Sequence, residues 1–249
     1  MRKPTMIMMV IMTFVFAVKS YAFTLKEAED VFYDYDKGLS YLQKSIDMFD
    51  QIVKESKDTN VLYEAYWMQS RVYLTLGDQA EPTHTDALKD YEAGKAAGEQ
   101  AIKINPKGAM GYFWYAANLG RMGQVKGILN SLFMLPTFRK NLDEAYRLAP
   151  NEPEVLEAYG EMYNQLPWIA GGSASKAIDY FKRSLKSDPN FTLSMAEMGS
   201  AYINDGKYEQ AREILEKVMN FETPTYRGDW VWYDKPLAKR LLDSIKDKK

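Results

Sequence analysis

The feature that most constrains the fold of this 249-residue chain is a recurring spacing of small and large apolar residues. It is clearest at residues 192–225, where Asp205-Gly206-Lys207 separates two stretches with helical periodicity. Gly199 and Ala211 are small at the positions where two antiparallel helices would cross closely, and Leu215 can fill the space beside them. Glycine at position 206 tolerates the left-handed backbone that ends a helix. The spacing therefore predicts a helical hairpin.

This hairpin resembles a tetratricopeptide repeat, and three upstream segments share its spacing in a degenerate form. Pro106, Pro150 and Pro189 close these segments and lie 44 and 39 residues apart. The usual period of the repeat is about 34 residues. The extra residues lie between the first and the second helix of each unit. We expect two of these inserts, Gly127–Pro136 and Pro167–Ser173, to form loops that shape a cavity or an interface between subunits.

Both ends of the array differ from the repeat, because an ordinary terminal unit would leave an apolar face bare. The residues after Thr24 carry apolar side chains at helical spacing, and Thr24 with Glu27 forms a predicted capping box. An aromatic segment, residues 226–233, precedes a last helix near residues 235–246. The sequence thus predicts one all-α domain, residues 23–249. It is a right-handed superhelix of about four degenerate tetratricopeptide-like hairpins with N- and C-terminal capping helices.

The composition excludes several kinds of function. With no Cys, the chain has no disulfide, thiolate metal ligand or Cys nucleophile. Its single His rules out a His-rich zinc site, and its net charge of −2 argues against nucleic acid as a partner, because neutralising phosphates needs a basic surplus. An enzyme with a nucleophilic triad is also disfavoured, because the chain has one imidazole to serve as a base and no Gly-x-Ser-x-Gly turn. We therefore predict a non-enzyme without metal or cofactor, with a hydrolase that uses paired carboxylates as the weaker alternative.

The first residues of the chain have the composition of an export signal. The basic start Arg2-Lys3 precedes an apolar stretch, Met6–Val18. Ser20 and Ala22 then supply small residues at the spacing that a signal peptidase requires. The apolar stretch has 13 residues, whereas a membrane-spanning helix needs roughly 20. We predict that residues 1–22 are a cleaved signal peptide and that the mature protein is periplasmic, has no membrane span and, lacking Cys, is not a lipoprotein.

Three segments extend the resemblance beyond the repeat. Residues 111–121, Gly-Tyr-Phe-Trp-Tyr-Ala-Ala-Asn-Leu-Gly-Arg, resemble the aromatic-Trp-x-Ala-Ala-Asn segment of the T component (TatT) associated with TRAP transporters. Residues 166–177 are similar to that family's Pro…Gly-Gly…Lys-Ala loop, and residues 233–242 resemble its closing Ala-x-x-Leu-Leu helix. The likeness covers roughly residues 60–245.

This resemblance implies a periplasmic accessory protein built on degenerate tetratricopeptide repeats. It also implies partners, namely further copies of the chain and the solute-binding subunit of a transporter for organic acids or other ligands with apolar tails. Members of that family are often lipoproteins, a feature that a chain without Cys lacks. The regulator of microtubule dynamics family shares the general repeat pattern, but the bacterial-looking leader argues against it.

Helical periodicity puts five positions of each first helix on one stripe, which faces the concave groove in tetratricopeptide superhelices. The stripe supplies five candidate binding residues: Trp67, Arg71, Phe113, Arg121 and Asn164. It begins aromatic and cationic and ends small and apolar, which suits an extended peptide or a ligand with one apolar and one charged end. The acidic members of the stripe, Glu154, Glu157 and Glu161, are expected to be solvated.

Three further candidates complete the set. Trp114 and Asn118 are one helical turn apart and share a face. Packing around a buried amide is the favoured interpretation, and donation from Asn118 to a ligand carboxylate is the alternative. Trp168 lies in the second insert. Next to it, Gly171-Gly172-Ser173 could bind an anion at a helix start, but a turn with an N-cap is favoured because the phosphate-loop Lys spacing is missing.

Together these features predict a scaffold that docks the solute-binding subunit of a TRAP-type transporter and can hold a small apolar organic acid. A general periplasmic adaptor that grips a peptide in its groove during envelope assembly is the alternative. Four apolar residues of the first insert can face inward or outward: Ile128, Leu129, Leu132 and Phe133. If they are exposed, we expect the protein to associate with itself or with another chain.

Overall fold

The computed structural model describes residues 23–80 and 87–248, and these residues form helices and connecting turns without a strand. The elements follow one another as α1 (Leu25–Tyr33), the 3₁₀ turn η1 (Asp34–Lys37), α2 (Ser40–Glu55), α3 (Thr59–Ala80), α4 (Ala87–Ile104), α5 (Ala109–Lys126), α6 (Ile128–Leu148), α7 (Pro153–Gln165), the 3₁₀ turn η3 (Trp168–Ala170), α8 (Ala174–Ser187), α9 (Thr192–Asn204), α10 (Tyr208–Met219), α11 (Arg227–Asp229), the π-helical turn η4 (Trp230–Asp234) and α12 (Lys235–Ser244).

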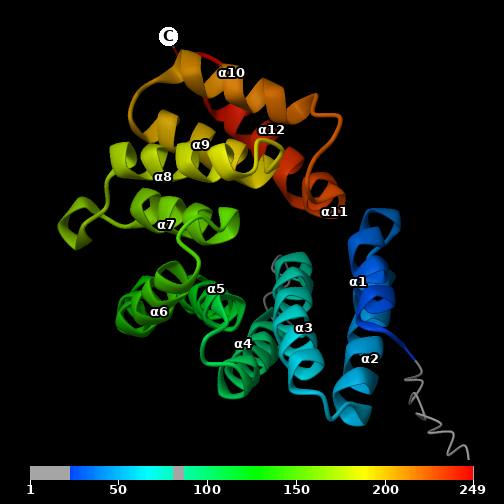
Figure 1. Cartoon of the computed structure of the whole chain (residues 1–249). Helices are drawn as coiled ribbons and strands as arrows, with labels where there is room; N and C mark the ends of the chain where they lie inside the picture. The colour runs from blue at the N-terminus through cyan, green and yellow to red at the C-terminus, as the bar shows by residue number, and fades with distance from the viewer. Residues whose placement is uncertain (1–22, 81–86, 249) are drawn as a thin grey trace, which may run out of the picture.

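Consecutive helices pack as hairpins, α3 with α4, α5 with α6, α7 with α8 and α9 with α10. The helices α1 and α2 cover the first hairpin, and α12 packs on α10 and covers the last. Figure 1 shows that the hairpins follow an arc and that α11 returns to the side of α1, where it packs on η1. The predicted all-α superhelix of helical hairpins with capping helices is therefore confirmed.

The crossing of α9 and α10 depends on the small residue that the sequence pattern predicts. A Cβ atom on Gly199 would lie 2.5 Å from Cδ2 of Leu215, so only glycine allows the two helices to approach this closely. Ala211 and Leu215 are fully buried at the same crossing. Gly206 follows the end of α9 with a φ of 73°, in the left-handed region that glycine adopts readily. The predicted hairpin is confirmed in its packing and in its turn.

The N-terminal cap also has the predicted local structure. The backbone N–H of Glu27 donates to Oγ1 of Thr24 at 3.2 Å, and the backbone N–H of Thr24 donates to Oε2 of Glu27 at 2.7 Å. These reciprocal bonds are the capping box that starts α1. Beyond it, Phe32, Phe49 and Met68 are fully buried between α1, α2 and α3. The cap thus shares an apolar core with the first hairpin.

The two inserts behave differently. The first does not form a loop, and that expectation is wrong. Gly127, with a φ of 91°, is the single non-helical residue between α5 and α6, and α6 begins at the next residue. Pro136 lies inside α6, where it omits one backbone N–H, and the helix continues beyond it. The insert residues therefore lengthen the helix, because no other strong helix breaker lies between Gly127 and Pro136.

The second insert is a loop around η3, as expected. Gly172 approaches the backbone oxygen of Leu166 so closely that a side chain would clash with it. Gly171 has a φ of 93°, and the hydroxyl of Ser173 accepts from the backbone N–H of Lys176 at 3.3 Å. The Gly-Gly-Ser segment is thus a tight turn with an N-cap, which confirms the favoured interpretation.

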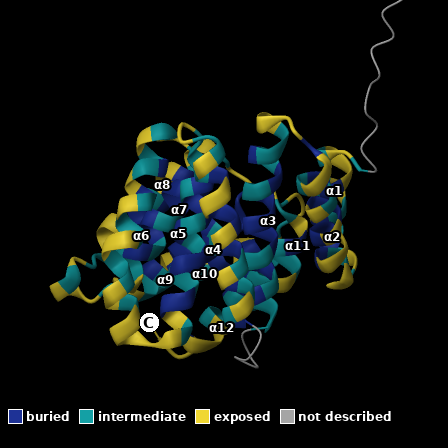
Figure 2. Ribbon diagram, turned by 90° about the horizontal axis from the view of Figure 1, so that it is seen from below, coloured by how far each residue is buried: buried dark blue, intermediate teal, exposed yellow. Residues whose placement is uncertain are grey.

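Buried residues concentrate where helices face one another, and exposed residues cover the outer surfaces (Figure 2). Within residues 23–80 and 87–248, no helix is both long enough and apolar enough to cross a membrane. The predicted signal peptide, residues 1–22, lies outside the described residues.

Candidate functional site

The inner side of the arc encloses a cavity of about 480 Å³. Residues of α3, α5, α6, α7 and α9 line it, together with residues of η1, α11 and η4 and of the segment that leads into α11. The cavity therefore lies between the repeats and a C-terminal segment that folds back across their concave side.

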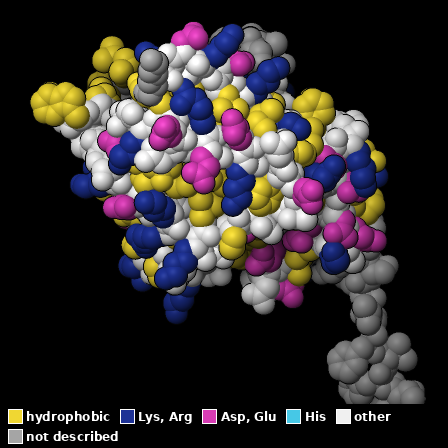
Figure 3. Space-filling view, turned by 90° about the horizontal axis from the view of Figure 1, so that it is seen from above, with side chains coloured by type: hydrophobic (Ala, Val, Ile, Leu, Met, Phe, Trp, Pro, Cys, Tyr) yellow, Lys and Arg dark blue, Asp and Glu magenta, His cyan; other side chains and the backbone are white. Residues whose placement is uncertain are grey.

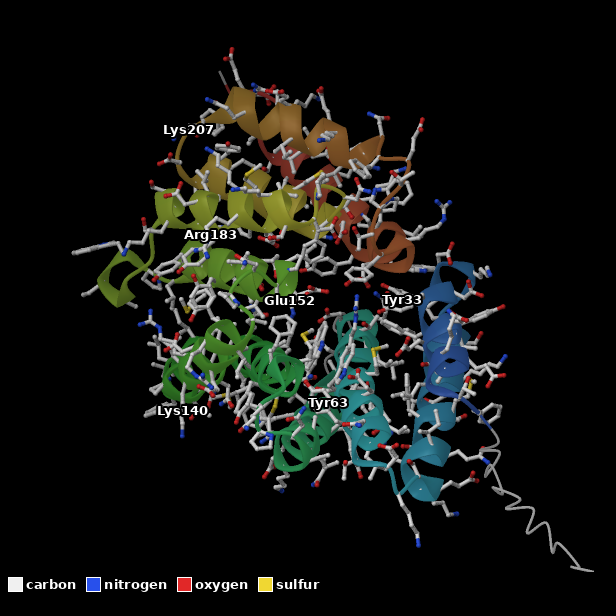
Figure 4. All side chains as sticks on the ribbon, viewed as in Figure 1. Tyr33, Tyr63, Lys140, Glu152, Arg183 and Lys207 are labelled. Carbon is white, nitrogen blue, oxygen red and sulfur yellow. The ribbon has the colours of Figure 1, made fainter. Side chains whose placement is uncertain are left out.

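This returning segment, residues 226–234, is held by contacts to the start of the chain. The hydroxyl of Tyr35 donates to Oδ1 of Asp229 at 2.5 Å, and the indole N–H of Trp232 donates to the backbone oxygen of Tyr35 at 3.0 Å. The rings of Tyr33 and Tyr226 are stacked with centroids 5.8 Å apart. Figure 4 labels Tyr33 at the part of α1 that faces α11. The first and last parts of the described chain thus meet and close the arc.

Arg71 is the buried cation at this closure. Its Nη2 atom lies 3.3 Å from Oδ2 of Asp229. Its Nη1 atom donates to the hydroxyl of Tyr33 at 3.3 Å, and its guanidinium lies 3.9 Å from the ring centroid of Tyr226. Burial alone would lower the pKa of Arg71, but the tyrosines and Asp229 outweigh it and raise the pKa. The guanidinium therefore stays charged and joins α3 to the returning segment.

Arg121 performs a similar role farther along the cavity. Its Nε atom lies 3.3 Å from Oδ1 of Asp78, and its Nη1 atom lies 3.3 Å from Oε1 of Glu161. Its Nη2 atom donates to the hydroxyl of Tyr233 at 3.3 Å. Arg121 therefore links α3, α5, α7 and η4 at one wall of the cavity.

Three buried acids lie near these cations. Burial raises the pKa of Glu197 and of Asp234 to about 8, and it holds the pKa of Glu157 well above its ordinary value. The hydroxyl of Thr192 donates to Oδ2 of Asp234 at 2.6 Å. The expectation that the acidic stripe is solvated is wrong for Glu157 and also for Glu154, since both are buried. The returning segment covers this part of the stripe, and Tyr226 donates to Glu154.

Four of the eight predicted binding residues line the cavity: Arg71, Phe113, Trp114 and Arg121. Phe113 and Trp114 form an aromatic wall, their rings 4.7 Å apart in an edge-to-face arrangement. The stripe therefore brings Phe113 and two cations to one site, and Trp114, which lies outside the stripe, completes the aromatic wall.

The other four predicted residues do not line the cavity. The amide of Asn118 donates to the backbone oxygens of Ser70 at 3.0 Å and Trp114 at 2.9 Å, which confirms the interpretation of a buried packing amide. Asn164 donates to Oγ of Ser200 at 3.1 Å.

Trp67 and Trp168 have different surroundings. Trp67 is half-buried, donates to Glu64 and packs between two core clusters. Trp168 points outward from η3 and is 85% exposed.

Four residues of the returning segment also line the cavity, and the repeat spacing did not predict them: Tyr226, Asp229, Tyr233 and Asp234. They fall in a segment that was expected only to cap the C-terminal end of the array. One signal was available, because tyrosines, tryptophans and acids are concentrated there outside the repeat spacing. Polar aromatic residues outside the repeat pattern can indicate contacts that the repeats themselves do not make.

Most exposed large apolar side chains belong to two segments beside the cavity. These residues, which we call the apolar rim, are Ile128, Leu129, Leu132 and Phe133 of α6, and Trp168 and Ile169 of η3. Phe133 is 85% exposed, and Leu132 and Pro167 place both segments at the cavity wall. Figure 3 shows apolar side chains projecting at one end of a surface that otherwise mixes acidic and basic groups. The four insert residues that the sequence left open are therefore exposed, and two of them, Ile128 and Leu132, also line the cavity.

Within the part of the chain that the structure describes, no three His, Asp or Glu side chains lie together in a way that could hold a metal ion. The site consists of ion pairs, aromatic rings and buried acids.

Comparison with known proteins gives two family matches. The family model described as "Regulator of microtubule dynamics protein 1-3" matches residues 30–169, and one described as "Tetratricopeptide repeat" matches residues 194–222. The second match coincides with the hairpin that the sequence predicts most clearly. The first covers α2 to α7 and so includes the aromatic wall and both arginines of the cavity.

Two curated relatives illustrate the first match. Regulator of microtubule dynamics protein 2 of Rattus norvegicus is 26% identical over 165 residues, which cover 59% of this chain and 40% of the rat protein. Regulator of microtubule dynamics protein 1 of Pongo abelii is 22% identical over 212 residues, which cover 78% of this chain and 65% of that protein. The chain thus spans less than two thirds of the length of these relatives.

Among solved structures, a thermophilic TPR protein of Thermus thermophilus is similar, with a TM-score of 0.60 and 16% identity. The match covers 90% of this chain and 100% of that chain. At this level of identity the likeness concerns the fold.

The comparisons do not support the T component of TRAP transporters. The family that matches is the one that the bacterial-looking leader argued against. The segment 111–121, which carried the likeness, serves packing here: Trp114 lines the cavity wall and Asn118 bonds to α3. Any crossing of two helical hairpins can require such residues, so they identify the repeat better than the family.

Proposed function

Because the chain belongs to the regulator of microtubule dynamics protein 1-3 family and carries tetratricopeptide-like hairpins, we propose that it is a non-catalytic scaffold that docks a protein partner on its apolar rim. The observation that carries this proposal is the exposure of the rim, above all Phe133 and Trp168, each 85% exposed. Soluble proteins rarely expose large apolar side chains close together unless something covers them.

The concave groove is the less favourable docking site for a peptide. The chain's own residues 226–234 cross it, and their contacts include the ion pair of the buried Arg71 with the partly exposed Asp229. A peptide would have to displace this segment and leave a buried guanidinium without its partner, which is costly. The adaptor that grips a peptide in its groove is therefore the weaker form of the scaffold hypothesis.

We also propose that the protein is exported. Support comes from the sequence alone: a basic start, an apolar stretch of 13 residues and small residues before position 23. In that compartment the partner could be the solute-binding subunit of a transporter, as the resemblance to the T component implied. Mass spectrometry of the intact protein from the producing cell tests export, because cleavage would leave Phe23 as the first residue.

Family membership favours a second candidate, an interaction with microtubules. The printed names of the relatives describe them as regulators of microtubule dynamics. Co-sedimentation of the purified protein with polymerised tubulin tests this candidate. If the protein pellets with microtubules whether or not the rim is intact, this candidate is favoured over a scaffold that docks its partner through the rim. A cleaved leader would argue against a microtubule interaction, because an exported protein does not meet microtubules.

The rim itself is tested by replacing Phe133 and Trp168 together with Ser. The native protein and the variant would serve as baits in an extract of the cells in which the protein is naturally expressed. Lys140→Ser in α6 is the matched control. We expect one partner to be retained by the native protein and the control, and lost by the rim variant. The same retention by all three would contradict the proposal. Binding of a second copy instead of another protein, seen by native mass spectrometry, would assign the rim to self-association.

A further inference from the structure

The cavity presents apolar surface that a bound molecule can reach. Apolar side chains from five helices line it and are partly exposed, so part of each remains accessible at the cavity wall. They extend from α3, α5, α6, α7 and α9 and include Leu74, Ala117, Leu135, Phe138, Ala158 and Leu193. The volume of about 480 Å³ falls among those of small-molecule sites, which are mostly apolar. The interior therefore has the size and the surface of a site for a small apolar molecule.

The ion pairs of the lining disfavour a charged ligand of either sign. Arg71 pairs with Asp229. Arg121 pairs with both Asp78 and Glu161. A carboxylate ligand would meet two guanidinium groups that already have carboxylate partners, and an ammonium ligand would meet three carboxylates that already have guanidinium partners. A charged group that enters such a site loses its hydration without gaining a free partner, which is costly.

The three other acids of the lining are buried, and none of them adds a free charge to the wall. Glu154 accepts a hydrogen bond from the hydroxyl of Tyr226 and lies close enough to Arg71 to favour the charged guanidinium. Burial holds the pKa of Glu157 well above its ordinary value and raises the pKa of Asp234 to about 8, so both acids hold protons near neutral pH. A neutral ligand is therefore the kind that this wall accepts without breaking an ion pair.

The opening of the cavity is also suited to an apolar molecule. Ile128 and Leu132 of α6 line the cavity and are 68% and 45% exposed, so they lie where it meets solvent. Pro167 lines it from the segment before η3. The exposed amides of Gln124 and Gln165 belong to the same lining, and Nε2 of Gln124 donates to Oε1 of Gln165 at 2.8 Å. An apolar molecule can thus enter past apolar side chains and past amides that bond to each other.

We propose that the cavity binds a small neutral molecule with an apolar body, which lies against the partly exposed apolar side chains of the five helices. Removal of apolar surface from water drives the binding, and the absence of charge leaves the ion pairs of Arg71 and Arg121 intact. This ligand is an addition to the partner on the apolar rim and does not depend on it. The small apolar organic acid expected from the sequence would instead bring a carboxylate to guanidinium groups that are already paired.

Three probes with one apolar body and different heads test the proposal: 2-naphthaleneethanol, 2-naphthylacetate and 2-(2-naphthyl)ethylamine. At neutral pH the first is uncharged, the second is an anion and the third is a cation. Isothermal titration calorimetry with the purified native protein should detect one alcohol per chain. We expect the alcohol to bind on the order of tenfold more tightly than either charged probe. Equal or tighter binding of the acid or of the amine, or no binding of any of the three, would overturn the proposal.

Two variants that fill the cavity locate the bound alcohol. Ala117→Phe in α5 and Ala158→Phe in α7 each place a ring at a partly exposed position of the lining, so each should weaken binding of the alcohol on the order of tenfold. Ala96→Phe, at an exposed position of α4, is the matched control and should have no effect. Circular dichroism establishes which variants are folded. Native affinity in a folded cavity variant would contradict the proposal, and the comparison of the three probes needs no variant.

A last arm separates the cavity from the apolar rim, since an apolar probe could also adhere to exposed rings. The variant with Phe133→Ser and Trp168→Ser changes two exposed side chains of the rim that are not part of the cavity lining. We expect it to bind the alcohol with native affinity. Loss of binding would place the probe on the rim, and the cavity proposal would be wrong. Partner docking is measured with protein baits, so its failure leaves the result with these probes unchanged.

Discussion

The hairpin α9–α10 and the returning segment α11–η4 follow each other in the chain, yet different kinds of contact hold them in place. The hairpin is joined by residues close in sequence: Gly199 allows Leu215 to approach, and the two lie 16 positions apart. The returning segment is joined by polar contacts to distant residues, with Asp229 bonded to Tyr35 and Arg71. Local packing thus determines the hairpin, and long-range charge and hydrogen bonding determine the segment that encloses the cavity.

The two regions therefore differ in what a substitution removes. In the hairpin, a change alters the volume at a packed crossing. In the returning segment, a change leaves a buried charge or hydrogen-bond group without its partner, which is costly even where little volume changes. The following predictions use this difference, from the largest expected effect to the smallest.

Replacing Arg71 by Ala should have the largest effect on stability. It removes the buried guanidinium that pairs with the partly exposed Asp229 and lies against the ring of Tyr226. We expect the free energy of unfolding to fall by about 3–5 kcal/mol, measured by urea denaturation. Lys26→Ala, which removes an exposed pair with Asp30, is the control and should change stability by less than about 1 kcal/mol. Equal effects of the two variants would show that the closure does not depend on the buried charge.

Replacing Gly199 by Leu tests the hairpin in the same way. The new side chain would overlap Leu215, and overpacking of this kind costs about 1–3 kcal/mol. The exposed Glu213→Ala on α10 serves as the control in the same urea titration. A stable Gly199→Leu variant would mean that α9 and α10 can separate, and the contrast between the two regions would weaken.

Replacing Asp234 by Asn should stabilise the protein in a pH-dependent way. In the native protein the folded state holds this proton up to about pH 8, whereas the unfolded chain loses it near the ordinary pKa of about 4. Between these values the unfolded state binds fewer protons, so this group lowers the free energy of unfolding as the pH rises.

The asparagine removes that dependence. We expect the variant to gain on the order of 1–2 kcal/mol over the native protein at pH 8 and little at pH 4, measured by thermal unfolding at both pH values. A gain that is larger at pH 4 than at pH 8 would contradict the raised pKa of Asp234.

The apolar rim should contribute least to stability. Phe133→Ser changes an exposed side chain away from the core, so we expect the free energy of unfolding to change by about 0.5 kcal/mol or less. Sedimentation velocity on the same samples should report the loss of any self-association. A large loss of stability would place Phe133 in the fold instead of at a docking surface.

The sequence predicted the elements that depend on neighbours. The Gly199 crossing, the turn at Gly206 and the capping box of Thr24 and Glu27 follow from residues a few positions apart. The prediction of a loop at the first insert was wrong, because residues in excess of the usual repeat length need not form irregular structure. A helix can absorb the same residues after a single break at Gly127.

The site was predictable only on the side that the repeats supply. Arg71, Phe113 and Arg121 follow from the first-helix positions, which helical periodicity assigns to the concave side, whereas Trp114 was named for the face that it shares with Asn118. The returning segment could not be placed, because Asp229 contacts a residue 194 positions earlier. The burial of Glu157 was missed for the same reason, since solvent exposure on a helix face depends on what lies across it.

The meeting of α11 with η1 also bears on how the array opens. In an open row of repeats the terminal units fray first, because each has a neighbour on one side alone. Here Tyr35 and Asp229 give the two ends a common boundary, so opening either end exposes the other. Amide hydrogens in α1 should therefore exchange with solvent at a rate set partly by residues near the opposite end of the chain.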